Sequence, residues 1–135
     1  MKKKNFYKLV EEICSADPRY KPESYEFVIH ALHFTQKKLK ESGHVSGREL
    51  LGGIKDYAIE QFGPLAKNVL NHWGILKTDD FGNIVYNMIK KKMLSRRDED
   101  SLEDFKKVYD FDVVFADILR SSVIKQIKEL EAEGI

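Results

Sequence analysis

Apolar side chains recur every three or four residues along most of the chain, and this spacing predicts a mainly α-helical fold. The expected helices cover residues 3–16, 23–41, 46–62, 64–73, 78–90 and 112–133. The helix at 78–90 follows the 3.6-residue period most closely, with Phe81, Ile84, Val85, Met88 and Ile89 on one face. The pattern therefore favours one compact bundle of about six helices, formed as a single domain over residues 1–135.

The stretch from Gly43 to Ile75 carries clear signals for the start and end of helices. Ser46 and Glu49 have the spacing of a capping box, in which each side chain pairs with the backbone N–H of the other residue. Gly63 suits the left-handed conformation that ends a helix, and Pro64 suits the first turn of the next one. These signals predict two consecutive helices.

Two adjacent glycines, Gly52 and Gly53, occupy the middle of the expected helix at 46–62. Each glycine costs about 1 kcal/mol there relative to alanine. This cost indicates that a neighbouring backbone passes too close for a side chain, and a ligand pressed against this face is the alternative.

Residues 98–112 carry two conflicting signals. Residues 102–109 could form a helical face behind a Ser101 cap, whereas residues 107–111 could form a strand that pairs back on residues 93–96. The second alternative adds one small β-hairpin and makes the bundle winged-helix-like. The sequence leaves both alternatives open.

The composition is typical of a globular protein with almost no net charge. Hydrophobic residues make up 42% of the chain and aromatic residues 11%, which excludes wholesale disorder. The 23 basic and 22 acidic side chains nearly cancel, so charge alone indicates no polyanionic partner. The single cysteine, Cys14, excludes an intramolecular disulfide and fits a reducing compartment. With no signal-peptide core and no transmembrane run in the sequence, we expect a cytoplasmic protein without a membrane partner.

Several short motifs stand out along residues 6–112. They are Asp17-Pro18-Arg19-Tyr20, Tyr25-Glu26-Phe27-Val28, His44-Val45-Ser46-Gly47-Arg48-Glu49-Leu50-Leu51, Phe62-Gly63-Pro64, His72-Trp73-Gly74-Ile75, Asp80-Phe81-Gly82 with Ile84-Val85, and Val108-Tyr109-Asp110-Phe111. Together they resemble a small bacterial family of uncharacterised proteins. The resemblance implies a bacterial, cytoplasmic protein, and it implies no catalytic residues, because the family has no assigned activity.

A basic cluster follows the expected helix at 78–90 and consists of Lys90, Lys91, Lys92, Arg96 and Arg97. The helix at 64–73, a tight connection and a second helix capped by Thr78 have the outline of a helix–turn–helix, and the hairpin would be its wing. The cluster could then neutralise phosphates. Asp79 and Asp80 oppose this interpretation, because they would repel phosphates at the start of the recognition helix.

The last expected helix, at 112–133, has an apolar stripe of Phe115, Leu119, Val123, Ile127 and Leu130. Its stride of nearly seven residues allows the helix to dock on its own domain or to pair with another subunit. The stripe is therefore the candidate association surface, for a protein partner or a homodimer.

Residues with metal-binding or catalytic potential are sparse. His30 and His33 are three residues apart on one expected helix and could share a metal, but no further ligand motif accompanies them, so we predict no metal and no cofactor. The Asp80-Phe81-Gly82 triplet of kinases stands here without the rest of the kinase motifs.

The favoured function is a non-enzymatic cytoplasmic module that binds a protein partner or itself. Nucleic-acid binding is the alternative, and a metal-dependent or small-molecule enzyme is the third hypothesis.

Overall fold

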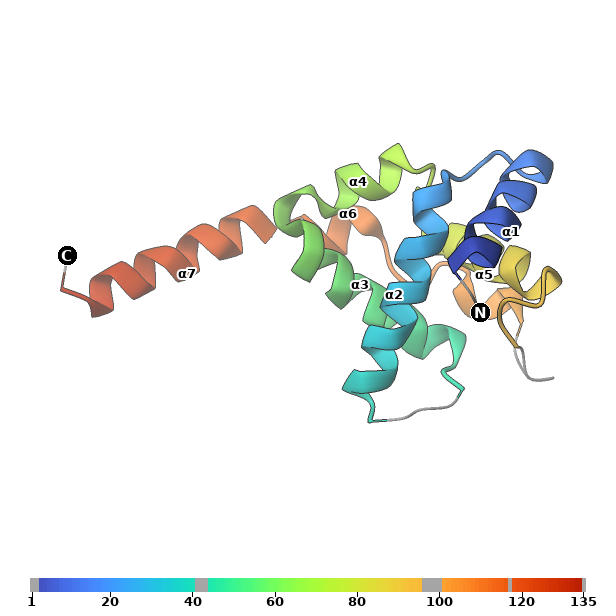
Figure 1. Ribbon diagram of the computed structural model, residues 1–135. Helices are drawn as coiled ribbons and strands as arrows, with labels where there is room; N and C mark the ends of the chain where they lie inside the picture. The colour runs from blue at the N-terminus through green and yellow to red at the C-terminus, as the bar shows by residue number, and fades with distance from the viewer. Residues whose placement is uncertain (1–2, 41–43, 96–100, 117, 135) are drawn as a thin grey trace.

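Figure 1 shows a computed structural model of the chain, which describes residues 3–40, 44–95, 101–116 and 118–134. The α-helices are α1 (Lys3–Ala16), α2 (Pro22–Lys38), α3 (Gly47–Phe62), α4 (Ala66–His72), α5 (Thr78–Lys90), α6 (Phe111–Val114) and α7 (Ile118–Ala132), and the 3-10 helices are η1 (Gly63–Leu65) and η2 (Leu102–Phe105). The predicted mainly α-helical fold is confirmed, and α1 to α5 lie within a few residues of their expected positions. Within the described ranges, no helix combines the length and the apolar character needed to cross a bilayer.

Helix α5 lies in the middle of the bundle. Helices α1, α2, α3 and η2 all pack against it, and α2 also packs along α3. Phe81, Ile84 and Met88 of α5 have no exposed surface, and Leu51 and Ile54 of α3 are equally buried. The strongest helical pattern of the sequence therefore belongs to a helix whose apolar face forms part of the core of the bundle.

The start of α3 has the predicted capping box. The Ser46 Oγ accepts a hydrogen bond from the Glu49 N–H at 3.1 Å, and the Glu49 Oε1 accepts one from the Ser46 N–H at 2.9 Å. At the other end Gly63 has a positive φ of 51°, and Pro64 lies in η1, which leads into α4. Local signals alone were enough to place these boundaries.

The two glycines of α3 have different surroundings. A Cβ carbon at Gly53 would lie 1.7 Å from the Thr35 Oγ1 of α2, whereas no atom lies within 4 Å of the corresponding position at Gly52. The expected close neighbour is therefore present at Gly53, although it is a side chain and not a backbone. At Gly52 the described residues supply no steric reason for a glycine.

The helical alternative for residues 102–109 is present in part, as the 3-10 helix η2. The Ser101 Oγ accepts a hydrogen bond from the Glu103 N–H at 3.0 Å, so Ser101 caps this helix as predicted. Phe105 at its end is buried against α5, next to Gly82. This contact anchors η2 to the centre of the bundle.

The alternative of a β-hairpin is not present, since no strand occurs in the described residues. The Lys107 N–H donates to the Asp79 Oδ1 at 3.2 Å, and the Val108 N–H donates to the Thr78 Oγ1 at 3.1 Å. In a hairpin, the backbone N–H groups of this segment would pair with residues 93–96. Here the Lys107 and Val108 N–H groups pair instead with side chains at the start of α5.

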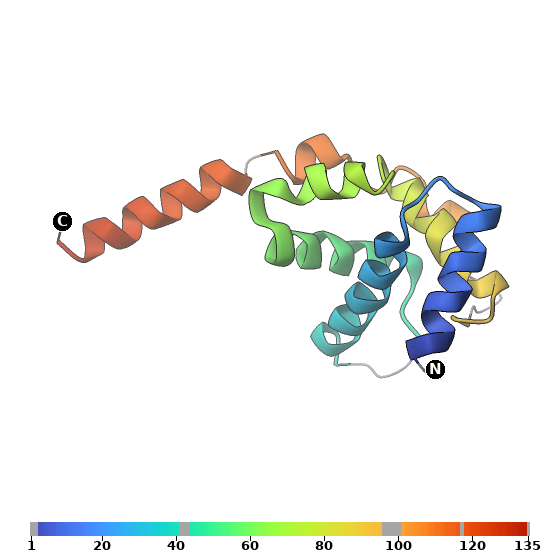
Figure 2. The same cartoon turned by 45° about the horizontal axis from the view of Figure 1, so that its top comes forward.

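The single helix expected at 112–133 is divided into α6 and α7. Phe115, between them, is only 6% exposed, and its ring packs edge-to-face on Phe111 with the centroids 5.5 Å apart. Because Phe115 enters the core here, its predicted place on the association surface is wrong. Helix α7 then leaves the bundle and points away from it (Figures 1 and 2).

Candidate functional site

The predicted nucleic-acid-binding residues lie at and beyond the end of α5. The three lysines at 90–92 are exposed, and the Lys91 Nζ lies 3.9 Å from the Glu12 Oε2 of α1. Arg96 and Arg97 lie outside the described residues. The structure therefore places only the lysine half of the basic cluster, beside a carboxylate.

The buried position of α5 weakens the winged-helix hypothesis. A recognition helix must present one face to a DNA groove. Helices α1, α2, α3 and η2 pack against α5, with Phe81, Ile84 and Met88 fully buried. The other side of α5 is only partly exposed, at Asn83, Tyr86 and Asn87. The described residues also contain no hairpin that could act as a wing. The winged-helix hypothesis is therefore supported by the exposed lysines but not by a recognition helix or a wing that could enter a DNA groove.

The histidines do not gather into a ligand set. His30 and His33 are exposed on α2, and the His30 Nε2 lies 3.6 Å from the Glu26 Oε1. His72 is at the end of α4, on another part of the bundle. Among the described residues, no three His, Cys, Asp or Glu side chains lie close enough together to hold a metal ion.

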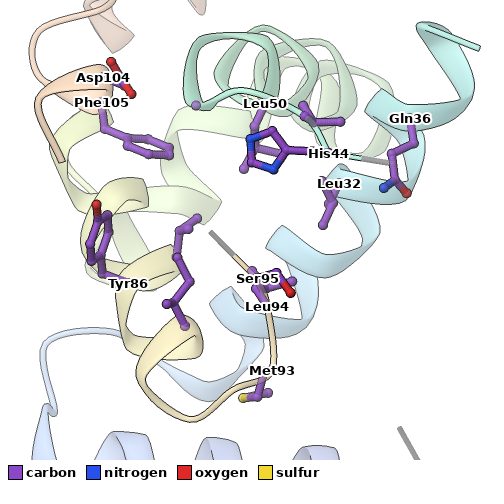
Figure 3. A pocket seen from close by; sticks show the side chains of 14 residues that line it. Leu32, Gln36, His44, Leu50, Tyr86, Met93, Leu94, Ser95, Asp104 and Phe105 are labelled. Atoms are coloured by element: carbon purple, nitrogen blue, oxygen red, sulfur yellow. The ribbon is translucent and has the colours of Figure 1, made fainter. Parts of the chain in front are cut away.

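A cavity of about 400 Å³ lies between α2, the start of α3, α5 and η2 (Figure 3). Leu32 forms part of its apolar wall, while His44, Tyr86 and Asp104 bring polar groups to it. The chain continues from His44 and from Ser95 into residues outside the described part. The described walls alone define no ligand chemistry, so we assign no function to this cavity.

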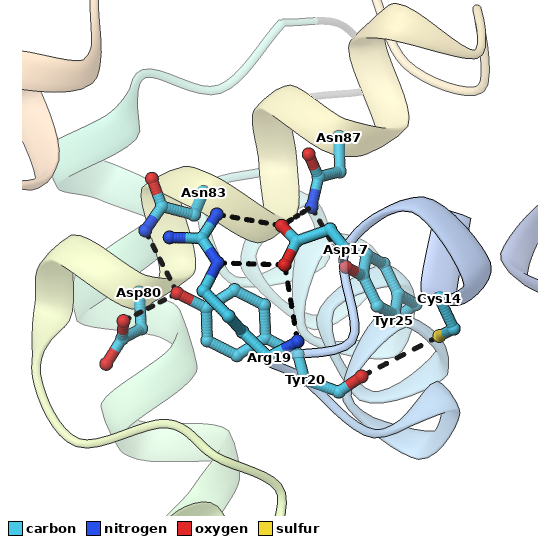
Figure 4. Close-up of polar contacts among 8 residues, drawn as sticks. All are labelled: Cys14, Asp17, Arg19, Tyr20, Tyr25, Asp80, Asn83 and Asn87. Carbon is cyan, nitrogen blue, oxygen red and sulfur yellow. Dashed lines mark hydrogen bonds and ion pairs between the residues drawn. The ribbon is translucent and has the colours of Figure 1, made fainter.

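A polar cluster joins the connector between α1 and α2 to α5 (Figure 4). Arg19 donates from Nε to the Asp17 Oδ1 at 2.8 Å and from Nη2 to the Asp17 Oδ2 at 2.7 Å. The Asn87 Nδ2 lies 2.9 Å from the same Oδ2 and 3.0 Å from the Tyr25 hydroxyl. The hydrogen bonds from Arg19 hold the pKa of Asp17 well below its usual range, whereas burial raises the pKa of Tyr25 to about 12.

The second half of this cluster is centred on Asp80. Its Oδ1 accepts the Tyr20 hydroxyl at 2.6 Å, and its Oδ2 accepts the Leu76 N–H at 2.8 Å. The Asn83 Nδ2 donates to the Tyr20 oxygen at 2.9 Å. Asp80 thus uses both carboxylate oxygens to hold the start of α5, which corrects the prediction that Thr78 caps this helix.

The hydrogen bonds of this polar cluster stabilise the fold, and its titratable groups are held in unreactive forms. Burial and the hydrogen bond to Asp80 raise the pKa of Tyr20, so this hydroxyl stays protonated and serves as a donor. Cys14 donates its Sγ–H to the Tyr20 carbonyl at 3.6 Å, and burial raises the pKa of its thiol, which disfavours a reactive thiolate. The Asp17-to-Tyr20 motif was visible in the sequence, but its partners on α5 were not.

Helix α7 carries the candidate association surface. Val123, Ile127 and Leu130 are 43%, 48% and 46% exposed, and Ile124, which the predicted stripe omits, is 42% exposed. Ile124 stands three residues before Ile127, so helical spacing alone could have included it. Leu119 belongs to α7, but its side chain lies outside the described part.

The comparisons with known proteins found no matching family model, no matching curated protein and no matching solved structure. A functional proposal for this chain therefore rests on its own residues.

Proposed function

We propose that this protein is a non-enzymatic association module, which pairs with a second copy of its own chain through α7. The observation that carries the proposal is that Val123, Ile124, Ile127 and Leu130 are exposed. They belong to a helix that points away from the bundle (Figure 2). Burying one Val, Leu or Ile side chain contributes roughly 1.5–3 kcal/mol, so several of them on one helix face favour burial against a partner. The cytoplasm remains the proposed location, because a lone cysteine suits a reducing compartment.

The length of α7 also supports a partner. Helices shorter than about 12–15 residues are marginal in water, because most helical stability in proteins comes from the packing of an apolar face. Helix α7 has 15 residues. Away from the bundle, a helix of this length gains stability by packing against another one.

Two charges at the two ends of the apolar face favour a second copy in antiparallel orientation. Arg120 and Glu131 are 11 residues apart, close to three helical turns, so both lie on the same side of α7, between the positions of Ile124 and Ile127 around the helix. Both side chains are exposed. In an antiparallel pair of identical helices, the Arg120 of each copy faces the Glu131 of the other, so the pair forms two such contacts.

The test is the mass of the full chain by sedimentation equilibrium, from low to high micromolar concentration. We expect the mass to rise from one chain towards two as concentration increases. Val123→Glu with Ile127→Glu should keep the protein monomeric, because two buried charges would oppose pairing. The matched control, Ser121→Glu with Ala132→Glu, adds the same charge on the opposite side of α7 and should still dimerise.

A charge exchange tests the orientation. Arg120→Glu should weaken dimerisation by placing like charges together, and adding Glu131→Arg should restore it. A wild-type protein that stays monomeric at every concentration would contradict self-association. Equal dissociation of the Ser121/Ala132 control would show that α7 pairs through a different face.

A further inference from the structure

A small aromatic pocket lies on the surface where α2, α3 and the end of α4 meet. Its volume is about 230 Å³, and its aromatic lining is Phe27, Tyr57, Phe62 and Trp73. Phe27 is 5% exposed and forms the floor, whereas the other three rings are partly exposed. None of the described side chains of α7 lines this pocket, so it is separate from the proposed association surface.

Phe27 and Phe62 are stacked, with their planes at 27° and their centroids 5.7 Å apart, while the other rings are inclined to them. The planes of Phe62 and Trp73 meet at 81° with the centroids 5.7 Å apart. The Phe27 centroid lies 5.4 Å from those of both Trp73 and Tyr57. Several rings around one small space are the arrangement that holds an alkylammonium cation, because each ring has a negative face.

The backbone holds Trp73 in place at this corner. Its carbonyl oxygen accepts a hydrogen bond from the Lys21 N–H at 3.0 Å. The next residue, Gly74, has a φ of 92°, and a Cβ carbon there would lie 2.2 Å from the Arg19 carbonyl oxygen. The end of α4 therefore lies tightly against the connector before α2, and one wall of the pocket is pre-formed.

Two carboxylates lie beside the rings, because Glu23 and Glu26 of α2 also line the pocket. The Glu26 Oε1 lies 3.6 Å from the His30 Nε2, and the Tyr7 hydroxyl donates to the Glu26 Oε2 at 3.4 Å. Among the described residues that line the pocket there is no lysine or arginine. The combined field of rings and carboxylates therefore attracts a cation and repels an anion.

We propose that this pocket binds an alkylated ammonium group, either on a free quaternary ammonium compound or on a methylated lysine side chain. The methyl groups pack on the rings, while the positive charge interacts with the ring faces and with the two carboxylates. A neutral group of the same shape keeps only the packing. An unmethylated ammonium is more strongly hydrated and is more costly to remove from water.

The fluorescence of Trp73 tests the proposal directly, because it is the only tryptophan in the chain. The full-length protein is titrated at about pH 8, where an ordinary imidazole is neutral. The probes are tetramethylammonium, choline, N-acetyl-trimethyllysine amide and the neutral tert-butyl analogue of choline. We expect a saturable emission change with the cations and about tenfold weaker binding of the neutral analogue. Tighter binding of choline would assign the site to a free cation, and tighter binding of the lysine derivative would assign it to a protein side chain.

Two variants probe the two parts of the pocket. Glu23→Gln with Glu26→Gln should weaken every cation several-fold and leave the neutral analogue unchanged. Phe62→Leu keeps an apolar side chain and should also weaken the cations. The matched control is Glu60→Gln, which removes an exposed carboxylate of α3 outside the pocket and should bind as the wild type does.

Thermal unfolding of each variant confirms that it is folded before it is titrated. A neutral analogue that binds as tightly as choline would overturn the proposal and leave a plain apolar pocket. Undiminished cation affinity in the Glu23/Glu26 variant would also overturn it, as would the lack of a saturable response to any of the cations.

Discussion

Gly53 of α3 lies directly against Thr35 of α2, so that a Cβ carbon on the glycine would be 1.7 Å from the Thr35 Oγ1 and 2.7 Å from the Thr35 Cβ. Thr35 is buried, and its hydroxyl donates to the Ala31 carbonyl at 2.7 Å. The threonine therefore has a fixed position and cannot easily move aside. The two helices touch at a point where no methyl group fits.

Gly53→Ala should destabilise the protein, because overpacking of this kind costs about 1–3 kcal/mol and exceeds the gain in helix propensity. Gly52→Ala is the matched control. It should stabilise the protein by about 0.5–1 kcal/mol, since no neighbouring atom of the described residues lies within 4 Å of the added methyl group. Urea unfolding followed by circular dichroism measures both changes. Similar stability of the two variants would mean that α2 and α3 are further apart at Gly53.

Asp17→Asn should change how the stability depends on pH. Pairing with Arg19 lowers the pKa of Asp17 in the folded state below the ordinary value of about 3.9. This stabilisation is complete above that pH and is lost as the pH falls through the lowered pKa. We expect the variant to be about 1 kcal/mol less stable near neutral pH, and the difference to shrink below about pH 4.

Urea unfolding at a series of pH values measures this effect. The control is Glu60→Gln, at an exposed position of α3. A stability loss in Asp17→Asn that is the same at every pH would show that the charge of Asp17 does not contribute.

Thr78→Val should loosen the contact between α5 and the segment that follows η2. The substitution keeps the shape of this fully buried side chain but removes the hydroxyl that accepts the Val108 N–H at 3.1 Å. An unpaired donor in this partly buried place costs about 1–3 kcal/mol. Hydrogen exchange at the Val108 amide should become faster. Thr78→Ser retains the hydroxyl and should preserve the protection of that amide, and equal exchange rates in the two variants would contradict the prediction.

Local sequence signals predicted the helical framework well. The capping box of Ser46 and Glu49 involves residues only three positions apart, so its pattern is complete within the sequence. The period of α5 was equally clear, although the sequence did not show which helices pack against it.

The candidate surfaces were predictable to different degrees. The apolar face of α7 follows from helical spacing, and Val123, Ile127 and Leu130 are exposed on it. The aromatic pocket was not predictable in this way. Phe27, Tyr57 and Trp73 come from different elements, and only the packing of α2, α3 and α4 brings them together.

The sequence by itself determined the positions of α1 to α5 to within a few residues, because capping, glycine conformation and apolar period depend on residues within one or two turns. Only the tertiary structure decided which groups pair across the bundle. Phe115 has the spacing of an association residue but lies in the core, where it packs on Phe111. The Lys107 N–H pairs with Asp79, 28 residues earlier, instead of forming a hairpin. Which groups pair depends on how residues far apart in the sequence compete for buried surface and for backbone donors. The spacing of residues within one helix does not show the outcome of this competition.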